Sequence, residues 1–538
     1  MKQTRRDFMK LTFGAAVCAA YSGSTAAAED RRPNILIAIS DDQSWPHTSF
    51  AGCKAVKTPA FDRVAREGVY FTNAFCASPG CGPSRASLLT GRYPWMNEQA
   101  GTHASSFPQK FAVYPDILEE NGYFVGYTRK GLSPGNWEIG GCRRNPAGNC
   151  FDRYENEVPA KGIKNNDYTR NFEYFLEQRP AGKPFCFWYG GKEPHRPYEE
   201  GSGLKAGKKV DEVAVPGFLP DNGIVRSDFL DYYNEIEWFD LHLNRMMKKL
   251  EEIGELDNTI IVVTGDNGMP FPRAKANCYE SGIHPPLAIR WPAKAKGGRV
   301  VQDLVSFVDL APTFLEAAGV RDPNNMSHPN PMIGKSLMNI LLSDKQGLVD
   351  PSRETVFAAR ERHSSARWQN LGYPQRAMRT QQYLYIYNFT PERWPAGAPQ
   401  EYVLQRYGVG KAKAEMESKL GPMHGAYADI DDGPTKAFLT QHADDPKIKP
   451  YLDLAVARRP AEEMFDIRKD PDCLKNLAAD PAFQTVRKEL HDKLFACLEK
   501  TKDPRVLGYG EVFDGYIRFS KLRSFPEPDW AKSSSEDE

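Results

Sequence analysis

The sequence predicts an α/β fold, with a large and mostly parallel sheet flanked by helices and a smaller C-terminal α+β domain. Four short apolar runs without alternation each end in a polar cluster, which is typical of strands buried on both faces. Helical patterns lie between them, and the longest covers residues 228–253. The four runs span residues 35–39, 123–127, 185–189 and 260–263.

Each run carries charged or amide side chains close to its end. Because the carboxyl ends of parallel strands meet at one edge of a sheet, we expect these side chains to face one crevice. The carboxylate and amide oxygens among them favour a hard divalent cation. A turn at the end of a strand is the alternative for the first acidic pair. In chain order the clusters contain Asp41 with Asp42, Lys130, His195, and Asp266 with Asn267.

A helix is predicted directly after Cys81. Pro83 suits the first position of a helix, and Gly91 suits its end. Cys81 would then lie at a helix N-terminus, where free N–H groups and the helix dipole favour an anion. The alternative is a cysteine that merely precedes a capped helix.

The length of 538 residues predicts one large domain and a smaller one, or two to four domains of ordinary size. We place the large domain at residues 31–345 and a C-terminal subdomain with a small antiparallel sheet at 350–515. The remainder, 516–538, is a tail that ends in a Ser- and Glu-rich stretch typical of disorder. Within the subdomain we expect strands at 356–359, 383–387 and 463–466 and an amphipathic helix at 481–500.

The composition argues against a general polyanion-binding protein, because 70 Lys and Arg residues balance 70 Asp and Glu residues. We therefore expect no nucleic-acid partner. Residues 1–28 resemble a twin-arginine signal peptide, with Arg5-Arg6 and a cleavage site at Ala26-Ala27-Ala28. Its apolar stretch, 11–20, is too short to span a bilayer. The expected location is periplasmic or secreted, without a stable membrane anchor; a structural N-terminal helix is the alternative.

The segment CGPSRASLLTGR, which begins at Cys81, resembles the signature of type I sulfatases. In that family the cysteine is oxidised after synthesis to formylglycine, and the hydrated aldehyde attacks sulfur. The resemblance spans most of the mature chain and implies an alkaline-phosphatase-like fold with a large mixed sheet. It also implies a maturation partner, either a formylglycine-generating enzyme or an anaerobic sulfatase-maturating enzyme.

The resemblance also assigns a metal site. Asp41, Asp42, Asp266 and Asn267 correspond to the metal ligands of the family, together with residue 81. Such a set of oxygen ligands implies Ca²⁺, with Mg²⁺ as the alternative.

Four further residues match catalytic positions of the family. Arg85 corresponds to the arginine that holds the formylglycine, and Lys130 and Lys275 correspond to lysines that bind the sulfate. His195 corresponds to the histidine that contacts the sulfate ester and protonates the leaving group.

One position departs from the family pattern. Many sulfatases carry Lys-x-His after the second strand, and the histidine helps to collapse the covalent intermediate. Here Leu132 occupies that place, and leucine cannot transfer a proton. Either His103 or His284 takes the role, or the turnover is arranged differently.

Segments 194–196, 266–272 and 372–377 are most similar to the heparan N-sulfatase (N-sulfoglucosamine sulfohydrolase) branch, which implies a sulfated saccharide as substrate. A sugar carboxylate or second sulfate is expected to bind Arg360, Arg362 and His363, with His284 assigned to the same surface. A solvated charge run is the alternative for these residues. The rival functions are an O-sulfatase for another polysaccharide, a phosphoryl-transfer hydrolase of the same superfamily, and a non-catalytic glycan-binding protein.

Overall fold

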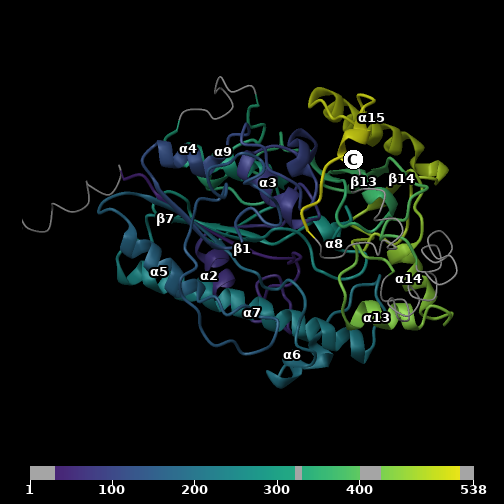
Figure 1. Cartoon of the computed structure of the whole chain (residues 1–538), viewed down its shortest axis with the longest axis horizontal. Helices are drawn as coiled ribbons and strands as arrows, with labels where there is room; N and C mark the ends of the chain where they lie inside the picture. The colour runs from purple at the N-terminus through teal and green to yellow at the C-terminus, as the bar shows by residue number, and fades with distance from the viewer. Residues whose placement is uncertain (1–30, 321–329, 400–425, 521–538) are drawn as a thin grey trace, which may run out of the picture.

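The computed structural model describes residues 31–320, 330–399 and 426–520. Its larger sheet has eight strands (Figure 1). The four apolar runs form four neighbouring parallel strands in this sheet, as predicted. From edge to edge the order is β5 (Asn149–Cys150), β4 (Phe124–Arg129), β6 (Phe185–Gly190), β1 (Asn34–Ser40), β7 (Thr259–Gly265), β8 (Leu287–Arg290), β2 (Val69–Phe71) and β9 (Arg299–Val301).

The sheet is mixed, because β8 runs antiparallel to both of its neighbours, β7 and β2. In the centre, Ile37 of β1 is in register with Trp188 of β6 and Val262 of β7. The predicted fold class is confirmed. Shorter elements are β3 (Ala74–Phe75), paired with β10 (Val305–Ser306), and the helices α6 (Ser202–Lys205), α8 (Glu280–Ile283) and α10 (Met338–Leu341).

Helices cover both faces of the large sheet (Figure 1). Ile35, Ile37 and Ile39 of β1 enter one hydrophobic core, whereas the alternate residues Leu36 and Ala38 enter another, so β1 is buried on both faces. One face carries α3 (Cys81–Thr90), α4 (Tyr114–Glu120) and α9 (Leu310–Ala317), and the other carries α2 (Pro59–Glu67), α5 (Tyr168–Gln178) and α7 (Gly223–Glu252).

The longest helix, α7, begins one turn before the predicted residue 228. Asn222 caps it, because its side-chain oxygen accepts hydrogen bonds from the backbone N–H groups of Ile224 and Val225, each at 3.0 Å. The sequence pattern placed the apolar stripe correctly and missed the first five residues of the helix, 223–227.

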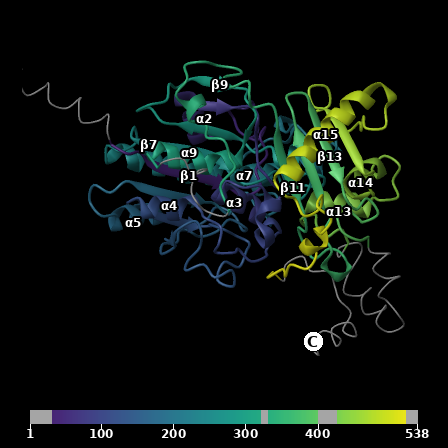
Figure 2. The same cartoon turned by 90° about the horizontal axis from the view of Figure 1, so that it is seen from above.

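The C-terminal region contains a second, antiparallel sheet beside the first (Figure 2). The three predicted strands and the terminal helix are present. The sheet order is β11 (Val356–Arg360), β12 (Gln375–Arg379), β13 (Tyr383–Asn388) and β14 (Glu462–Asp466), accompanied by α13 (Pro434–Gln441), α14 (Lys449–Val456) and α15 (Gln484–Lys500).

Strand β12 was not predicted, and its composition explains why. Its sequence, Gln-Arg-Ala-Met-Arg, contains no apolar run, yet all five residues are buried. Arg376 is accommodated there by ion pairs with Asp503 at 2.5 Å and Glu361 at 2.7 Å. Those acids are supplied by other elements, so the local sequence does not reveal the burial.

The predicted signal peptide and most of the predicted tail lie outside the described residues. Residues 516–520 pack against the large domain: Phe519 N–H donates to the Ala104 carbonyl at 2.8 Å, and the Ser105 hydroxyl donates to the Ile517 carbonyl at 2.6 Å. Among the helices of the described residues, none combines the length and apolar character that crossing a bilayer requires.

Candidate active site

Cys81 is the first residue of α3, and this helix starts two residues earlier than Pro83 predicts. The Ser84 N–H donates to the Gly80 carbonyl at 3.0 Å, so the first turn of the helix contains Pro83 instead of beginning at it. Gly91 ends the helix in the left-handed region, with φ of 60°, as predicted. All ten residues of α3 are buried, which fixes Cys81 in the interior of the crevice.

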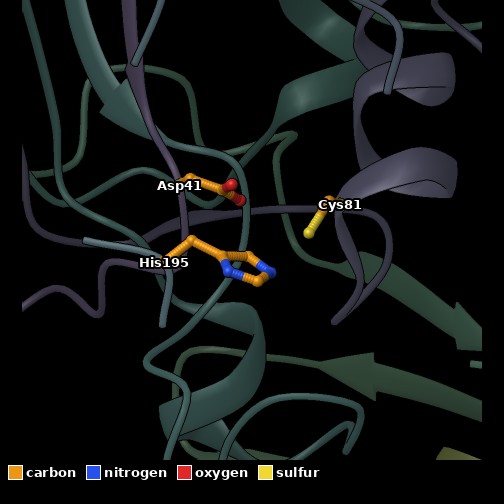
Figure 3. Close-up of side chains that lie close together, drawn as sticks. All are labelled: Asp41, Cys81 and His195. Carbon is orange, nitrogen blue, oxygen red and sulfur yellow. The ribbon is translucent and has the colours of Figure 1, made fainter. Parts of the chain in front are cut away.

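The strand-end clusters meet around Cys81. Figure 3 shows Asp41, Cys81 and His195 lying close together, although they follow β1, begin α3 and follow β6, respectively. The Cys81 thiol donates to Oδ1 of Asp42 at 3.7 Å. Ligand atoms of Asp41, Asp42, Cys81 and Asp266 all lie within 4.8 Å of one another. The predicted convergence of these side chains at the carboxyl ends of the parallel strands is therefore present.

Two buried oxygens at this point have no hydrogen-bond donor among the described residues. They are Oδ1 of Asp41 and Oδ1 of Asn267. The amide nitrogen of Asn267 donates to Oδ1 of Asp42 at 2.8 Å, which orients the amide oxygen of Asn267 away from Asp42. Unpaired carboxylate and amide oxygens in a buried site are ligands that a hard divalent cation would satisfy. The residues present thus fit the metal that the sequence predicts.

Fixed cations partly balance these acids. Arg85 donates to Oδ2 of Asp266 at 2.8 Å and to the Lys130 carbonyl at 2.6 Å. The Lys130 ammonium donates to Asp41, and the Lys275 ammonium donates to Oδ2 of Asp42 at 2.5 Å. Arg85, Lys130 and Lys275 are therefore all part of the centre.

The electrostatic environment gives the two neighbouring aspartates very different pKa values. Burial alone would raise the pKa of Asp41, but the cations of Lys130, Arg85 and Lys275 outweigh it and lower the pKa to about 2. Burial raises the pKa of Asp42 to about 7, against the attraction of Lys275 and with the help of neighbouring carboxylates. Burial and Asp41 also raise the pKa of the Cys81 thiol well above its usual range. A thiol in this position would stay protonated at neutral pH and be a weak nucleophile.

His195 lies at the open side of the centre and is a quarter exposed. Its Nδ1 is 2.6 Å from the Arg196 carbonyl, and its Nε2 is 3.9 Å from Oδ2 of Asp42. The following residue, Arg196, forms two hydrogen bonds of 2.8 Å with Asp228 of α7. The helix thereby fixes the loop that carries His195.

The two alternative histidines lie in different places. His284 pairs with Glu280 at 3.1 Å, stacks on Trp45, and lines a separate cavity of about 920 Å³ whose lining does not include Cys81. His103 packs on His363 with ring centroids 4.4 Å apart. A Cβ atom added to Gly80 would lie 3.1 Å from Nδ1 of His363. The His103–His363 pair therefore lies beside the start of α3, and His284 does not.

Arg360 and Arg362 are buried, so the alternative of a solvated charge run is wrong. Their exposed fractions are 3% and 2%. Arg360 donates to Asp429 at 2.6 Å, and Arg362 donates to the Tyr516 carbonyl. Burial raises the free energy of the charged forms and lowers the pKa of each arginine to about 10, despite the nearby acids.

Sequence reasoning missed Asp431. This residue precedes α13 in the C-terminal region, and its Oδ2 accepts a hydrogen bond from Lys275 at 3.1 Å. It follows no apolar strand, and the polar sequence around it gives no signal of burial. Only the packing of the second region against the first brings it to the centre.

Comparisons with known proteins identify the family. A sulfatase family model matches residues 33–320, and a model described as N-sulphoglucosamine sulphohydrolase, C-terminal, matches residues 273–394. Human N-sulphoglucosamine sulphohydrolase is 25% identical over 506 residues, which cover 88% of this chain and 92% of that protein. An ulvan-active sulfatase of Formosa agariphila is 27% identical over 513 residues, which cover 90% of this chain and 77% of that protein.

Solved structures share the fold. BT4656 in complex with its substrate D-glucosamine-2-N,6-O-disulfate has a TM-score of 0.61 at 21% identity, over 88% of this chain and 99% of that chain. A phosphonate monoester hydrolase from Silicibacter pomeroyi also has a TM-score of 0.61, at 16% identity, over 88% and 96% of the two chains.

The chain belongs to the sulfatase family, because the family model covers more than half of it. Enzymes of this family use a metal ion and a formylglycine residue made from a cysteine. In the present structure the Sγ atom of Cys81 stands where the oxygen of that residue would be.

Proposed function

We propose that this protein is a calcium-dependent sulfatase that removes sulfate from a heparan-type saccharide, with a formylglycine made from Cys81. The observation that carries the proposal is the position of Cys81 at the start of α3, 3.7 Å from Asp42 and within the cluster of strand-end acids. When formed, the formylglycine supplies a hydrated aldehyde whose hydroxyl acts as a nucleophile.

The other residues bind the sulfate and move protons. Lys130, Lys275 and the N-terminus of α3 stabilise the negative charge on the sulfuryl oxygens. His195 protonates the oxygen or nitrogen of the leaving group, since it lies at the open side of the centre. Arg85 keeps Asp266 and the Lys130 backbone in place through its hydrogen bonds.

The proposed cation is Ca²⁺, with Mg²⁺ as the alternative. Asp41, Asp42, Asp266 and Asn267 would hold it, together with residue 81, and it would act as a Lewis acid beside the sulfate group. The unpaired oxygens of Asp41 and Asn267 support a cation with several oxygen ligands.

Leu132 occupies the position at which many sulfatases carry a histidine. We propose that His103 takes the role of that histidine in the collapse of the covalent intermediate. Its contact with His363, which borders Gly80, supports a place near the start of α3. His284 is the weaker candidate, because Glu280 and Trp45 hold it in another cavity.

The proposed substrate group is an N-sulfoglucosamine unit, supported by the match of the C-terminal region and by the human relative. The alternative is an O-sulfatase for another polysaccharide, since other relatives are an ulvan-active sulfatase and an N-acetylglucosamine-6-O-sulfatase. Arg362 and His363 are proposed to shape the side of the crevice that receives a second anionic group. Arg360, which is paired with Asp429, is proposed to support them from the interior.

A substrate panel tests this function. Matured protein should release sulfate from N-sulfoglucosamine or from an aryl sulfate, and should act on the matching phosphate monoester much more slowly. The Cys81→Ala variant should be inactive on all of them. A preference for the phosphate ester, or full activity in the variant, would contradict the proposal.

We further propose export through the twin-arginine route, together with modification of Cys81 by a formylglycine-generating or anaerobic sulfatase-maturating enzyme. The motivation is the Arg5-Arg6 pair ahead of a short apolar stretch. Replacing both arginines by lysine should leave the precursor in the cytoplasm. Cell fractionation that finds the variant exported normally would rule out this route.

A further inference from the structure

The C-terminal region places one buried carboxylate in the catalytic centre. Asp431 is only 6% exposed. An oxygen of Asp431, an oxygen of Asp42 and a ring nitrogen of His195 lie within 4.8 Å of one another. None of the motifs discussed above includes Asp431, and its role in the reaction is unassigned.

Lys275 contacts two carboxylates at once. Its ammonium group is 2.5 Å from Oδ2 of Asp42 and 3.1 Å from Oδ2 of Asp431. All three side chains are almost fully buried, so water cannot replace either carboxylate as a partner of the ammonium group.

A cation bound by Asp42 changes this balance. The oxygens of Asp42 would hold the cation, and the ammonium group of Lys275, repelled by its charge, would need another acceptor in the buried site. Asp431 is already within hydrogen-bond distance and supplies the negative charge that this step needs.

We propose that Asp431 is a positioning residue that holds Lys275 while Asp42 binds the cation. The centre could then hold a cation at Asp42 and the ammonium group of Lys275 at the same time. This inference rests on the proposed cation site and adds to it a residue from the C-terminal region.

Calcium binding to the purified protein tests the proposal without any dependence on turnover. Isothermal titration should show that Asp431→Asn binds calcium roughly tenfold more weakly than wild type, the change expected for one charge-assisted interaction. Asp432→Asn is the matched control, because Asp432 is the next residue, its side chain is 71% exposed, and it pairs with Lys436 at 2.8 Å. The control should bind calcium like wild type.

A second pair of variants separates positioning from direct ligation. In a Lys275→Met background the ammonium is gone, so Asp431→Asn should cause only a small further loss of calcium affinity. The full tenfold loss in that background would overturn the proposal and make Asp431 a ligand in its own right. Asp431→Glu keeps the charge and should retain most of the affinity, which guards against a merely misfolded Asp431→Asn variant.

The outcomes also distinguish this inference from the proposed function. Equal calcium affinity in wild type and Asp431→Asn would overturn the role of Asp431 and leave the cation site standing. Failure of the wild type to bind calcium would overturn both.

Discussion

Asp41 and Asp42 are neighbours in the chain, yet their surroundings shift the pKa values of their carboxyl groups in opposite directions. Burial opposes ionisation of both carboxyl groups. At Asp41 the positive charges of Lys130, Arg85 and Lys275 outweigh the effect of burial and lower the pKa to about 2. At Asp42, burial and the negative charges of Asp41 and Asp266 oppose ionisation and raise the pKa to about 7. The metal-free centre therefore contains more carboxyl groups than its lysine and arginine side chains can neutralise.

This imbalance predicts a pH-dependent effect of calcium on stability. Asp42 has its pKa raised from 3.8 to about 7, so the metal-free protein loses stability as the pH rises between these values, by up to about 1.4 kcal/mol per pH unit. Calcium binds the ionised form of Asp42, so calcium binding offsets this loss of stability. Thermal unfolding should show a larger calcium-induced rise in melting temperature at pH 8 than at pH 5.

The Asp42→Asn variant is the control for that measurement, since its side chain cannot titrate. It should lose most of the pH dependence of the calcium effect. An equal rise in melting temperature at pH 5 and pH 8 in the wild type would contradict the assignment of Asp42.

Among the elements, α7 does more than cover the sheet. Its Asp228 binds Arg196, beside His195, and also accepts a hydrogen bond from the Thr435 hydroxyl at 2.6 Å at the start of α13. One carboxylate thus connects the His195 loop, α7 and the C-terminal region. All three partners are buried, so no water can substitute for a lost contact.

Two ion pairs of the same helix region permit a matched comparison. Asp228→Ala leaves the Arg196 guanidinium buried and unpaired, and should lower the free energy of unfolding by about 3–5 kcal/mol. Asp221→Ala breaks the pair with Arg226, where the Asp221 side chain is 56% exposed, and should cost less than about 1 kcal/mol. Urea unfolding of both variants measures the difference; similar losses would show that the Asp228 contact is not structurally important.

The elements also show where local sequence is sufficient and where it is not. Strands β1, β4, β6 and β7 were predictable, because strands buried on both faces must be apolar throughout. Strand β12 was not predictable, because distant acids neutralise the arginine that it buries. The metal and lysine positions followed from the strand ends, since the topology of a parallel sheet brings those ends together.

At the scale of the whole molecule, the centre belongs to two regions. The large domain supplies the strand-end acids, Arg85 of α3, Lys130 and Lys275, whereas the C-terminal region supplies Asp431 and His363. Contacts between regions depend on how they pack, which a local pattern does not encode. This explains why Asp431 was missed and why His284, only a few residues from Lys275, proved to line another cavity.

In the proposed mechanism, catalysis depends on the conversion of Cys81 to formylglycine at the start of α3. The most direct test measures, in the same preparations, the fraction of the Cys81 peptide that carries formylglycine by mass spectrometry and the rate of sulfate release per chain. Preparations made with and without a maturation enzyme should differ in both, and the rate should rise in proportion to the converted fraction. Sulfate release at a constant rate from protein in which residue 81 is entirely cysteine would contradict the account.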